Sequence, residues 1–194
     1  GIVVGYVGTV AIQHDQLLDA LQRDYRSDLD RKVCMLPELL DRVSAWRARD
    51  ERIVFTNGCF DLLHVGHVTY LERARRAGDR LVLGLNTDRS IRALKGPGRP
   101  LVQEEDRARV LASLASVDAV IVFDEDNPIE LIRRIRPDVL AKGADYSEAE
   151  VVGAADVRSW GGEVVLVPLV GGKSSTNLIE NIRESGERAG RVER

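Results

Sequence analysis

The 194-residue chain has few cysteines, no long apolar run and little net charge, the features that mark several specialised classes of protein. It holds only two cysteines, Cys34 and Cys59, which match no metal-binding spacing, so a reducing compartment fits best. No apolar run approaches the roughly 18 residues that a membrane-spanning helix needs. The net charge of −3 argues against a general binder of nucleic acids or anionic membranes. A cytoplasmic protein without nucleic-acid or membrane partners is therefore expected.

Histidine is scarce too, yet two of the three histidines stand in one short window. His64 and His67 open a helix that follows an apolar strand, 53–55, and a turn of small residues. A strand end, a glycine turn and a helix start offer free N–H groups and a positive dipole end, which suit a phosphate chain. Two imidazoles that donate hydrogen bonds could also hold charge developing on a phosphorus atom. A lone histidine at a helix start is more often a cap or a surface residue, but the pair favours the phosphate role.

From Glu51 onward, strand patterns alternate with helical patterns, and the expected strands are 52–56, 81–85, 119–123, 138–141 and 163–167. This alternation predicts an α/β fold: a Rossmann-like, parallel, five-stranded sheet with helices on both faces, preceded by an N-terminal helical segment. The expected limits are a first segment 1–48, a central domain 49–183 and a charged tail 184–194.

Unusual residues follow several of the expected strands. Ligands of such sheets bind beyond the carboxyl ends of the strands, at the point where the strand order reverses. In this chain the histidines follow the first strand, and the other polar groups at these ends are 86–88, 142–145 and 174–176. Their convergence at one edge predicts a single binding site.

The histidine window, 56–67, resembles the nucleotidyltransferases that carry a His-x-Gly-His motif, the cytidylyltransferase-like group. The likeness covers about residues 50 to 183 and is greatest to the heptose 1-phosphate adenylyltransferases, which form one domain of bifunctional heptose kinase/adenylyltransferase enzymes. The segments that carry this narrower likeness are 56–61, 94–96, 99–100, 142–146 and 174–177. Residues 1 to about 22 resemble the end of the ribokinase-like kinase domain of those enzymes. Segment 1–48 is thus expected to be a kinase remnant plus linker, and no kinase activity is expected because the kinase's Gly-Ala-Gly-Asp motif is absent.

The resemblance implies transfer of AMP from ATP to D-glycero-β-D-manno-heptose 1-phosphate, which gives pyrophosphate and ADP-heptose, a lipopolysaccharide-core precursor. Mg²⁺ is expected on the ATP phosphates rather than in a protein-built metal site, because such ions rarely receive an all-protein cage. One alternative is CTP-dependent transfer to a polyol phosphate such as glycerol 3-phosphate, against which the Ser-Ser-Thr-Asn cluster argues. Another is a non-catalytic nucleotide-binding module. A homodimer is a further expectation, since these folds often dimerise.

Four residues are expected to be catalytic: His64, His67, Lys95 and Lys142. The histidines would grip the triphosphate and the reacting phosphorus. Lys95 lies on a Gly/Pro-rich loop that either closes over the triphosphate or is a solvated surface loop. By resemblance, the loop with Lys142 holds the nucleotide, and Asp145 lies near the ribose or base. The residues expected to bind the nucleotide are Thr56, Asn57, Gly58, Phe60, Gly66, His67, Gly143, Asp145, Ser175 and Thr176.

Within that set, Thr56 and Asn57 are expected to face the nucleotide or the sugar phosphate. Gly58 would let the nucleotide approach the backbone, and Phe60 would pack below it. Cys59 is expected to fill space, because phosphoryl transfer of this kind needs no thiolate.

Ser175 and Thr176 open the last helix, where their hydroxyls and the free N–H groups would take the β- and γ-phosphates. Ordinary N-capping is the alternative, and one helix start can do both.

Five further residues are expected to bind the substrate, and four of them have a structural alternative. Asp61 either orients a histidine or caps the turn. Asn86 and Asp88 either bind the sugar phosphate or cap the turn that follows the second strand. Arg99 would join the loop closure over the triphosphate. Arg107, one turn into the next helix, either reaches the same phosphates or is a surface charge.

Overall fold

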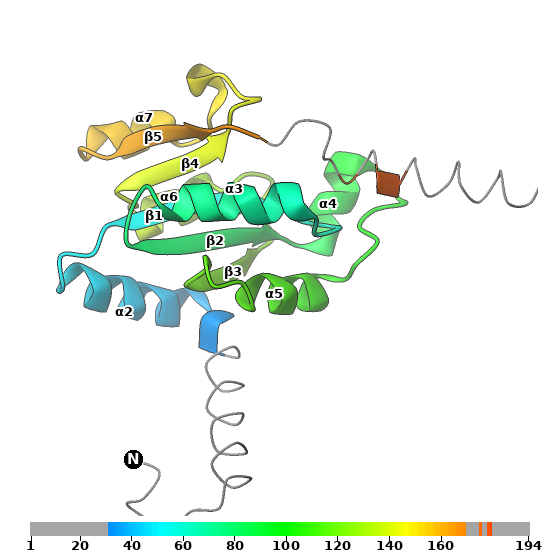
Figure 1. Ribbon diagram of the computed structural model, residues 1–194, viewed down its shortest axis with the longest axis horizontal. Coiled ribbons are helices and arrows are strands. Elements are labelled where there is room, and N and C mark those ends of the chain that lie inside the picture. Colours follow the sequence, from blue (N-terminus) through cyan, green and yellow to red (C-terminus); the bar gives the residue numbers. More distant parts are fainter. Residues whose placement is uncertain (1–30, 170–174, 176–177, 180–194) are drawn as a thin grey trace, which may run out of the picture.

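The computed structural model describes residues 31–169, 175 and 178–179. Its centre is a five-stranded parallel sheet in the order β3-β2-β1-β4-β5, which confirms the expected Rossmann-like α/β fold (Figure 1). Because helices cover both faces, the strands are near-continuous apolar runs rather than alternating ones. The strands are β1 Ile53–Gly58, β2 Arg80–Asn86, β3 Ala119–Phe123, β4 Val139–Gly143 and β5 Glu163–Val167.

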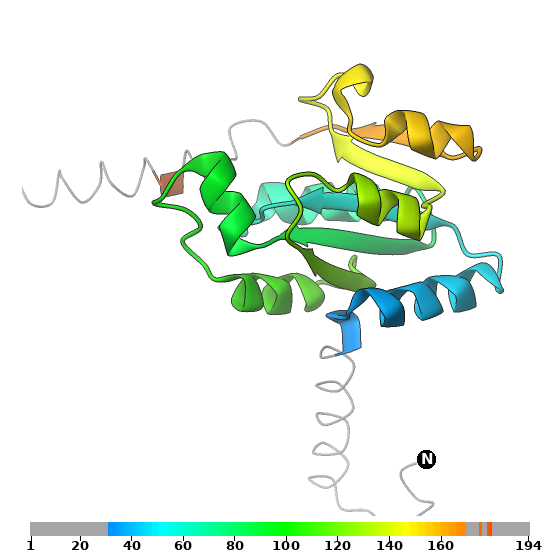
Figure 2. The same cartoon turned by 180° about the vertical axis from the view of Figure 1, so that it is seen from behind.

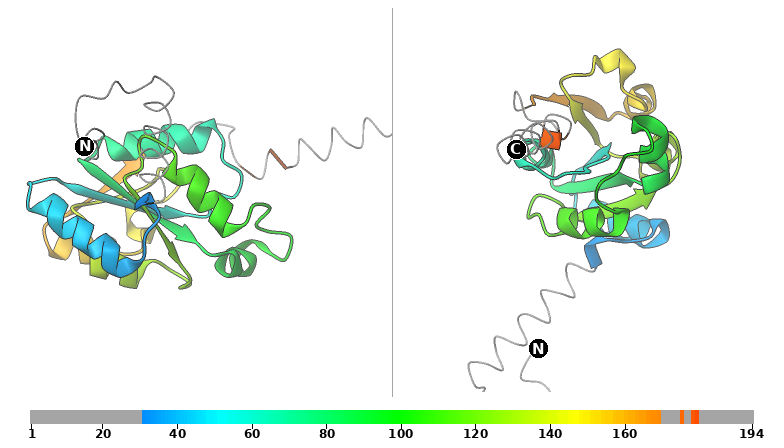
Figure 3. Two further views of the ribbon diagram at one scale, coloured as in Figure 1. Left: turned by 90° about the horizontal axis from the view of Figure 1, so that it is seen from below. Right: turned by 90° about the vertical axis from the view of Figure 1, so that its right-hand side faces the viewer.

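Two layers of helices sandwich this sheet. One face carries α2 Leu36–Arg47, α6 Ile129–Ile135 and α7 Ala154–Ser159, and Figure 2 shows this side. The other face carries α3 Val65–Arg75 and α5 Glu104–Ala112, so α2 and α5 lie on opposite sides of the sheet (Figure 3, left). Each layer therefore buries its own apolar cluster, around Leu39, Ile132 and Val157 on one face and around Leu71 and Leu111 on the other.

Helix α2 belongs to the compact domain. Its residues Leu39, Val43 and Trp46 are buried against the sheet, so the packed unit begins before residue 49. Just ahead of α2, Val33 forms a one-residue parallel bridge to Val120 on the outer edge of β3. Residues 1–30, which include most of the expected kinase remnant, and the tail 184–194 lie outside the described residues.

A short helix that the sequence pattern did not predict, α4 Asp88–Lys95, follows β2. Thr87 caps it by accepting a hydrogen bond from Ser90 N–H at 3.2 Å. Lys95 is thus the last helical residue, and the Gly/Pro-rich loop begins after it.

The sequence favours one helix running to Trp160 after a capping box of Ser147 and Glu150, but the structure divides this segment. The capping interaction of Ser147 with Glu150 forms as expected, but it opens only the short 3₁₀ helix η1 Glu148–Glu150. Gly153, with φ of 88°, then turns the chain before α7 begins, and a side chain there would press against Ile132.

A half-buried carboxylate holds the amino-terminal edge of the sheet. Asp118, directly before β3, accepts hydrogen bonds from Leu81 N–H at 2.8 Å, Arg75 Nε at 2.9 Å and Arg80 Nη1 at 3.1 Å. This network lies at the edge opposite to the strand ends that carry the histidines. Within the described ranges, no helix is both long enough and apolar enough to cross a membrane.

Candidate active site

A cavity of about 570 Å³ opens at the carboxyl edge of the sheet, where the ends of β1 and β4 meet the start of α3 and the end of α4 (Figure 1). The strand order reverses at β1, which has β2 on one side and β4 on the other, and open α/β sheets bind ligands at such a point. All four residues expected to be catalytic line this cavity. The lining residues are Asn57, Gly58, Cys59, Phe60, Asp61, His64, Gly66, His67, Tyr70, Leu94, Lys95, Lys142, Gly143, Asp145, Tyr146, Leu169 and Ser175.

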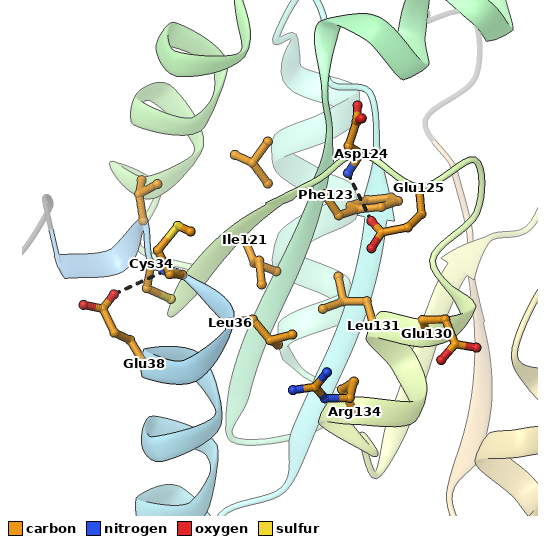
Figure 4. Close-up of a pocket in the computed structure, with 13 residues that line it drawn as sticks. Cys34, Leu36, Glu38, Ile121, Phe123, Asp124, Glu125, Glu130, Leu131 and Arg134 are labelled. Atoms are coloured by element: carbon orange, nitrogen blue, oxygen red, sulfur yellow. Dashed lines mark hydrogen bonds between the residues drawn. The ribbon is translucent and has the colours of Figure 1, made fainter.

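A second cavity, of about 450 Å³, lies between α2, β3 and α6 (Figure 4). Apolar side chains such as Leu36, Ile121 and Leu131 form its centre. One guanidinium, from Arg134, stands against four carboxylates, from Glu38, Asp124, Glu125 and Glu130. Arginines outside the lining, Arg89 and Arg133, pair with two of these carboxylates, Asp124 and Glu130. The lining itself offers a phosphate chain one guanidinium and neither histidine nor lysine, so the cavity with the histidines is the candidate phosphate site.

The two histidines form a stacked pair at the start of α3. His64 is the extended residue before the helix, and the His67 N–H donates to the His64 carbonyl at 2.9 Å. Their rings stack with centroids 3.9 Å apart and planes 20° apart. Phe60 supports the pair edge-on, with its ring 5.1 Å from that of His67. Phe60 packs so tightly below Gly58 that a Cβ there would lie 2.8 Å from the Phe60 ring.

His67 is poised to donate a hydrogen bond in its neutral form. Burial, the neighbouring His64 and the charge of Lys95 together lower the pKa of His67 to about 4. His67 is therefore neutral at pH 7. Its Nδ1 is buried and has no hydrogen-bonding partner in the described part of the chain.

Two lysines contribute positive charge to the cavity. Lys95 is exposed at the rim, whereas Lys142 is half-buried at the end of β4. The Lys142 ammonium donates to the amide oxygen of Asn57 and lies 6.0 Å from the centre of the Tyr146 ring. Burial lowers the pKa of Lys142 to about 8, against the opposing charge of Asp145. An anion bound in the cavity would reverse that shift.

The far wall of the cavity is formed by the loop after β4. A Cβ on Gly143 would clash with the Asp145 carboxylate and press on Leu169, so a larger residue there would displace the Asp145 side chain. Ser175 lines the same cavity and donates from its hydroxyl to the Leu62 carbonyl at 3.2 Å. Thr176, its expected companion, lies outside the described residues.

Thr56 does not face the cavity, so its expected contact with a ligand is wrong. Its side chain is fully buried, and its hydroxyl lies 2.7 Å from the Tyr70 hydroxyl, which in turn donates to the Ala141 carbonyl at 3.2 Å. Thr56 therefore links β1 to α3. Tyr70, which the sequence reasoning missed, lines the cavity, and its place one helical turn after His67 was the available signal.

Arg107 is neither a surface charge nor a residue of the cavity wall. It is 2% exposed and donates to the carbonyls of Val102, Cys59 and Asn86 and to the Asp88 carboxylate, at 2.6–3.0 Å. Asn86 and Asp88 likewise lie away from the cavity, and the Asn86 amide donates to Ser90 Oγ at 3.2 Å. The contacts of Asn86 and Asp88 therefore agree better with a role in the turn after β2, their structural alternative, than with the expected contact to a sugar phosphate.

Asp61 and Arg99 bind each other. Asp61 Oδ2 accepts from Arg99 Nε at 2.5 Å, and Asp61 Oδ1 accepts from the N–H groups of Leu101 and Val102 at 2.7 and 3.0 Å. The carboxylate thus binds a distant loop rather than its own turn. Arg99 does not line the cavity, so its expected position over a triphosphate is not the one observed.

Comparison with known proteins gives a consistent assignment. The family model described as cytidylyltransferase-like matches residues 55–189. The Bifunctional protein HldE of Methylobacillus flagellatus is 64% identical over 182 residues, which are 94% of this chain and 37% of that protein. The protein of the same name from Magnetococcus marinus is 57% identical over the same shares. The chain therefore spans little more than a third of the length of these curated relatives.

Two solved structures share the fold. A lipopolysaccharide core biosynthesis protein from Thermoplasma volcanium is 28% identical, with a TM-score of 0.52 over 62% of this chain and 97% of that one. A pantoate-beta-alanine ligase from Francisella tularensis, with a TM-score of 0.50 over 70% of this chain and 66% of that one, is 14% identical and supports the fold alone.

The buried ammonium of Lys142 should lower the stability of the unliganded protein. Its pKa falls from 10.5 to about 8 on folding, so at pH 7 the folded state carries the full cost of burying the charge. Because one pKa unit corresponds to about 1.4 kcal/mol, Lys142→Met should raise the free energy of unfolding by on the order of 2 kcal/mol. Urea denaturation measures this, with Lys95→Met, at the exposed lysine, as the matched control.

The pH dependence provides a second check on the same variant. The unfolded chain holds the Lys142 proton up to a pH near 10.5, so wild-type stability should rise between pH 8 and that value and the advantage of Lys142→Met should shrink. A Lys142→Met protein no more stable than Lys95→Met at pH 7 would contradict the account of a desolvated charge.

Proposed function

The chain belongs to the cytidylyltransferase-like family, and from this premise we propose that it transfers AMP from ATP to D-glycero-β-D-manno-heptose 1-phosphate. The products are ADP-heptose and pyrophosphate. The observation that carries the proposal is the stacked histidine pair, with His67 neutral, which shares one cavity with two lysines at the reversal point of the sheet.

In this reaction an oxygen of the sugar phosphate attacks the α-phosphorus of ATP. The bond from that phosphorus to the bridging oxygen breaks, and pyrophosphate leaves with the electron pair. The nucleophile is already anionic, so no base has to remove a proton and no covalent intermediate forms. Catalysis then rests on in-line positioning and on neutralisation of charge.

The cavity offers both kinds of group. His64 and His67 would donate hydrogen bonds to oxygens around the reacting phosphorus, where fixed donors in a water-poor site act most strongly. Lys95 and Lys142 would neutralise the triphosphate. Desolvation of Lys142 supports this role, because a buried ammonium gains most from an arriving anion.

We assign the nucleotide to the wall between the two strand ends. Gly58 and Gly143 stand at these two strand ends and line the cavity, so their backbone would border the ligand, and Asp145 would lie near the ribose or base. The phosphates would lie along the start of α3, toward Ser175. The proposed nucleotide-binding residues are Asn57, Gly58, Phe60, Gly66, His67, Gly143, Asp145, Ser175 and Thr176.

The sugar is proposed from likeness rather than from geometry. The curated relatives carry the name Bifunctional protein HldE, and a solved relative is called a lipopolysaccharide core biosynthesis protein. The segments that resemble heptose 1-phosphate adenylyltransferases include Lys95 and Lys142 through Tyr146, and both segments reach the cavity. ADP-heptose for a lipopolysaccharide core is the product that fits both the names of the relatives and the likeness of these segments.

Mg²⁺ would enter as part of the substrate. The described residues gather no group of three side chains able to hold a metal. The cavity wall instead supplies lysines and histidines, with Asp145 as its carboxylate besides the Asp61 already paired with Arg99. Such a wall fits an ion that is held by the triphosphate and its own waters, where it would neutralise phosphate charge. We place the reaction in the cytoplasm, where ATP and sugar phosphates are made, and retain a homodimer as a prediction.

A screen of pyrophosphate release tests the function. Purified protein with Mg²⁺ should release pyrophosphate from ATP in the presence of the heptose 1-phosphate, and far less with CTP. Release with CTP and glycerol 3-phosphate but not with ATP would establish the cytidylyltransferase alternative. ATP binding without release for any pair of substrates would establish a non-catalytic module.

The histidine assignment is tested by His67→Ala. Loss of one donor to the reacting phosphorus should lower kcat by ~10²–10³ while the thermal unfolding midpoint changes little. Glu72→Ala, an exposed change on the same helix, is the matched control and should keep wild-type kcat. Equal turnover by the His67→Ala and Glu72→Ala proteins would refute the assignment.

A further inference from the structure

Asp61 is a buried carboxylate whose hydrogen-bonding partners among the described residues come from one distant loop. Its side chain is 1% exposed, and it accepts hydrogen bonds from Arg99 Nε and from the N–H groups of Leu101 and Val102. A buried charge is costly unless it is paired and hydrogen-bonded, and these three donors satisfy that need. Asp61 also stands three residues before His64, in the turn that leads into the histidine pair.

The loop that Asp61 binds is otherwise loosely packed. A Cβ at Gly96 or Gly98 would meet no atom within 4 Å, so the first half of the loop touches little of the protein. In the second half of the loop, the Arg99 side chain donates to the Asp61 carboxylate. The Val102 N–H also donates to Asp61, and the Val102 carbonyl accepts from Arg107. Asp61 is therefore the main anchor of this loop to the cavity.

The loop continues directly from Lys95, the last residue of α4. Helix α4 is held at its start, where Arg107 Nη2 donates to the Asp88 carboxylate at 2.6 Å. Arg107 Nη1 donates to the Cys59 carbonyl at 2.6 Å, two residues before Asp61. The helix and loop that present Lys95 are thus tied at both ends to one short turn, and that turn also carries the histidines.

We propose that Asp61 is a positioning residue that sets the place of Lys95 relative to the histidine pair. The inference rests on the function proposed above and deepens it, because it names what brings two parts of the site into register. Asp61 acts through Lys95 and takes no part in the chemistry itself. Arg99, at the other end of the ion pair, serves the same role from the loop.

The consequence for catalysis follows from geometry. Lys95 neutralises charge only while its ammonium reaches the phosphates that the histidines hold. Misplacement of a reacting or neutralising group by about 1 Å can cost ~10²-fold in rate. Loss of the Asp61 anchor should therefore remove most of what Lys95 contributes, while it leaves the sheet and the histidine stack in place.

A double-mutant cycle between Asp61→Asn and Lys95→Ala tests this. We expect Asp61→Asn to lower kcat by ~10²-fold, because the asparagine keeps the size of the side chain but loses the ion pair with Arg99. In the Lys95→Ala background the same change should cost less than about threefold, because the residue through which Asp61 acts is gone. Losses that multiply in the double variant, or wild-type kcat in Asp61→Asn, would overturn the proposal. If Asp61→Asn fails to fold, Arg99→Gln takes its place in the same cycle.

A matched control separates positioning from general destabilisation. Asp118→Asn alters a half-buried carboxylate that likewise binds arginines and a backbone N–H, at the opposite edge of the sheet. It should lower the unfolding midpoint yet leave kcat unchanged below that midpoint. An equal loss of kcat in Asp118→Asn would also overturn the proposal, because softening of the whole domain would then explain both.

A binding version of the cycle separates this inference from the proposed function. Calorimetry with Mg²⁺ and ATP needs no turnover, and Lys95→Ala should weaken ATP binding in wild type but not in Asp61→Asn. Equal weakening in both backgrounds contradicts the inference even if the enzyme is active. If wild type binds ATP but releases no pyrophosphate, the proposed reaction fails while the cycle still decides the role of Asp61. If wild type binds no ATP, both the proposed function and the inference about Asp61 are wrong.

Discussion

The rest of the site depends on a desolvated cavity in which two lysines, Lys95 and Lys142, face one carboxylate, Asp145, besides the Asp61 that is paired with Arg99. Burial lowers the pKa of Lys142 to about 8. Burial, together with His64 and Lys95 nearby, lowers the pKa of His67 to about 4. The cavity therefore disfavours further positive charge. Asp61, the buried carboxylate closest in sequence to the histidines, is already bound to Arg99. The arrangement costs stability without a ligand, and an incoming triphosphate relieves that cost. Stability and function oppose each other here.

The fold keeps this cavity separate from the charges that only hold the scaffold. Asp118 binds two arginines at the amino-terminal edge of the sheet, far along the strands from the histidines. Arg107 and Asp61 lie behind the cavity wall and connect the histidine turn to α4 and its loop. Parallel strands make this division natural, since every strand delivers its carboxyl end, and the loop that follows, to the same edge.

Much of this could be predicted from the sequence, because it depends on local pattern. Apolar runs gave the five strands, and the residues after strands one and four gave the histidine pair and Lys142, all of which line one cavity. The errors concern partners distant in sequence. Nothing near Thr56 shows that Tyr70 takes its hydroxyl, and nothing near Arg107 shows that three carbonyls and Asp88 surround its guanidinium. A polar residue at a strand end looks the same in sequence whether it faces a ligand or a buried partner. Helix α4 was missed because it is only eight residues long and precedes a Gly/Pro-rich loop.

The central claim is that the stacked histidine pair is placed to receive a triphosphate, with His67 desolvated and neutral. Nuclear magnetic resonance of the His67 ring, followed through a pH titration with and without Mg²⁺ and ATP, tests it most directly. The account predicts a pKa near 4 in the free protein and a higher one in the complex, because the bound anion favours the protonated ring. Titration of the free ring near 6.5, with resonances that ATP leaves unmoved, would contradict it.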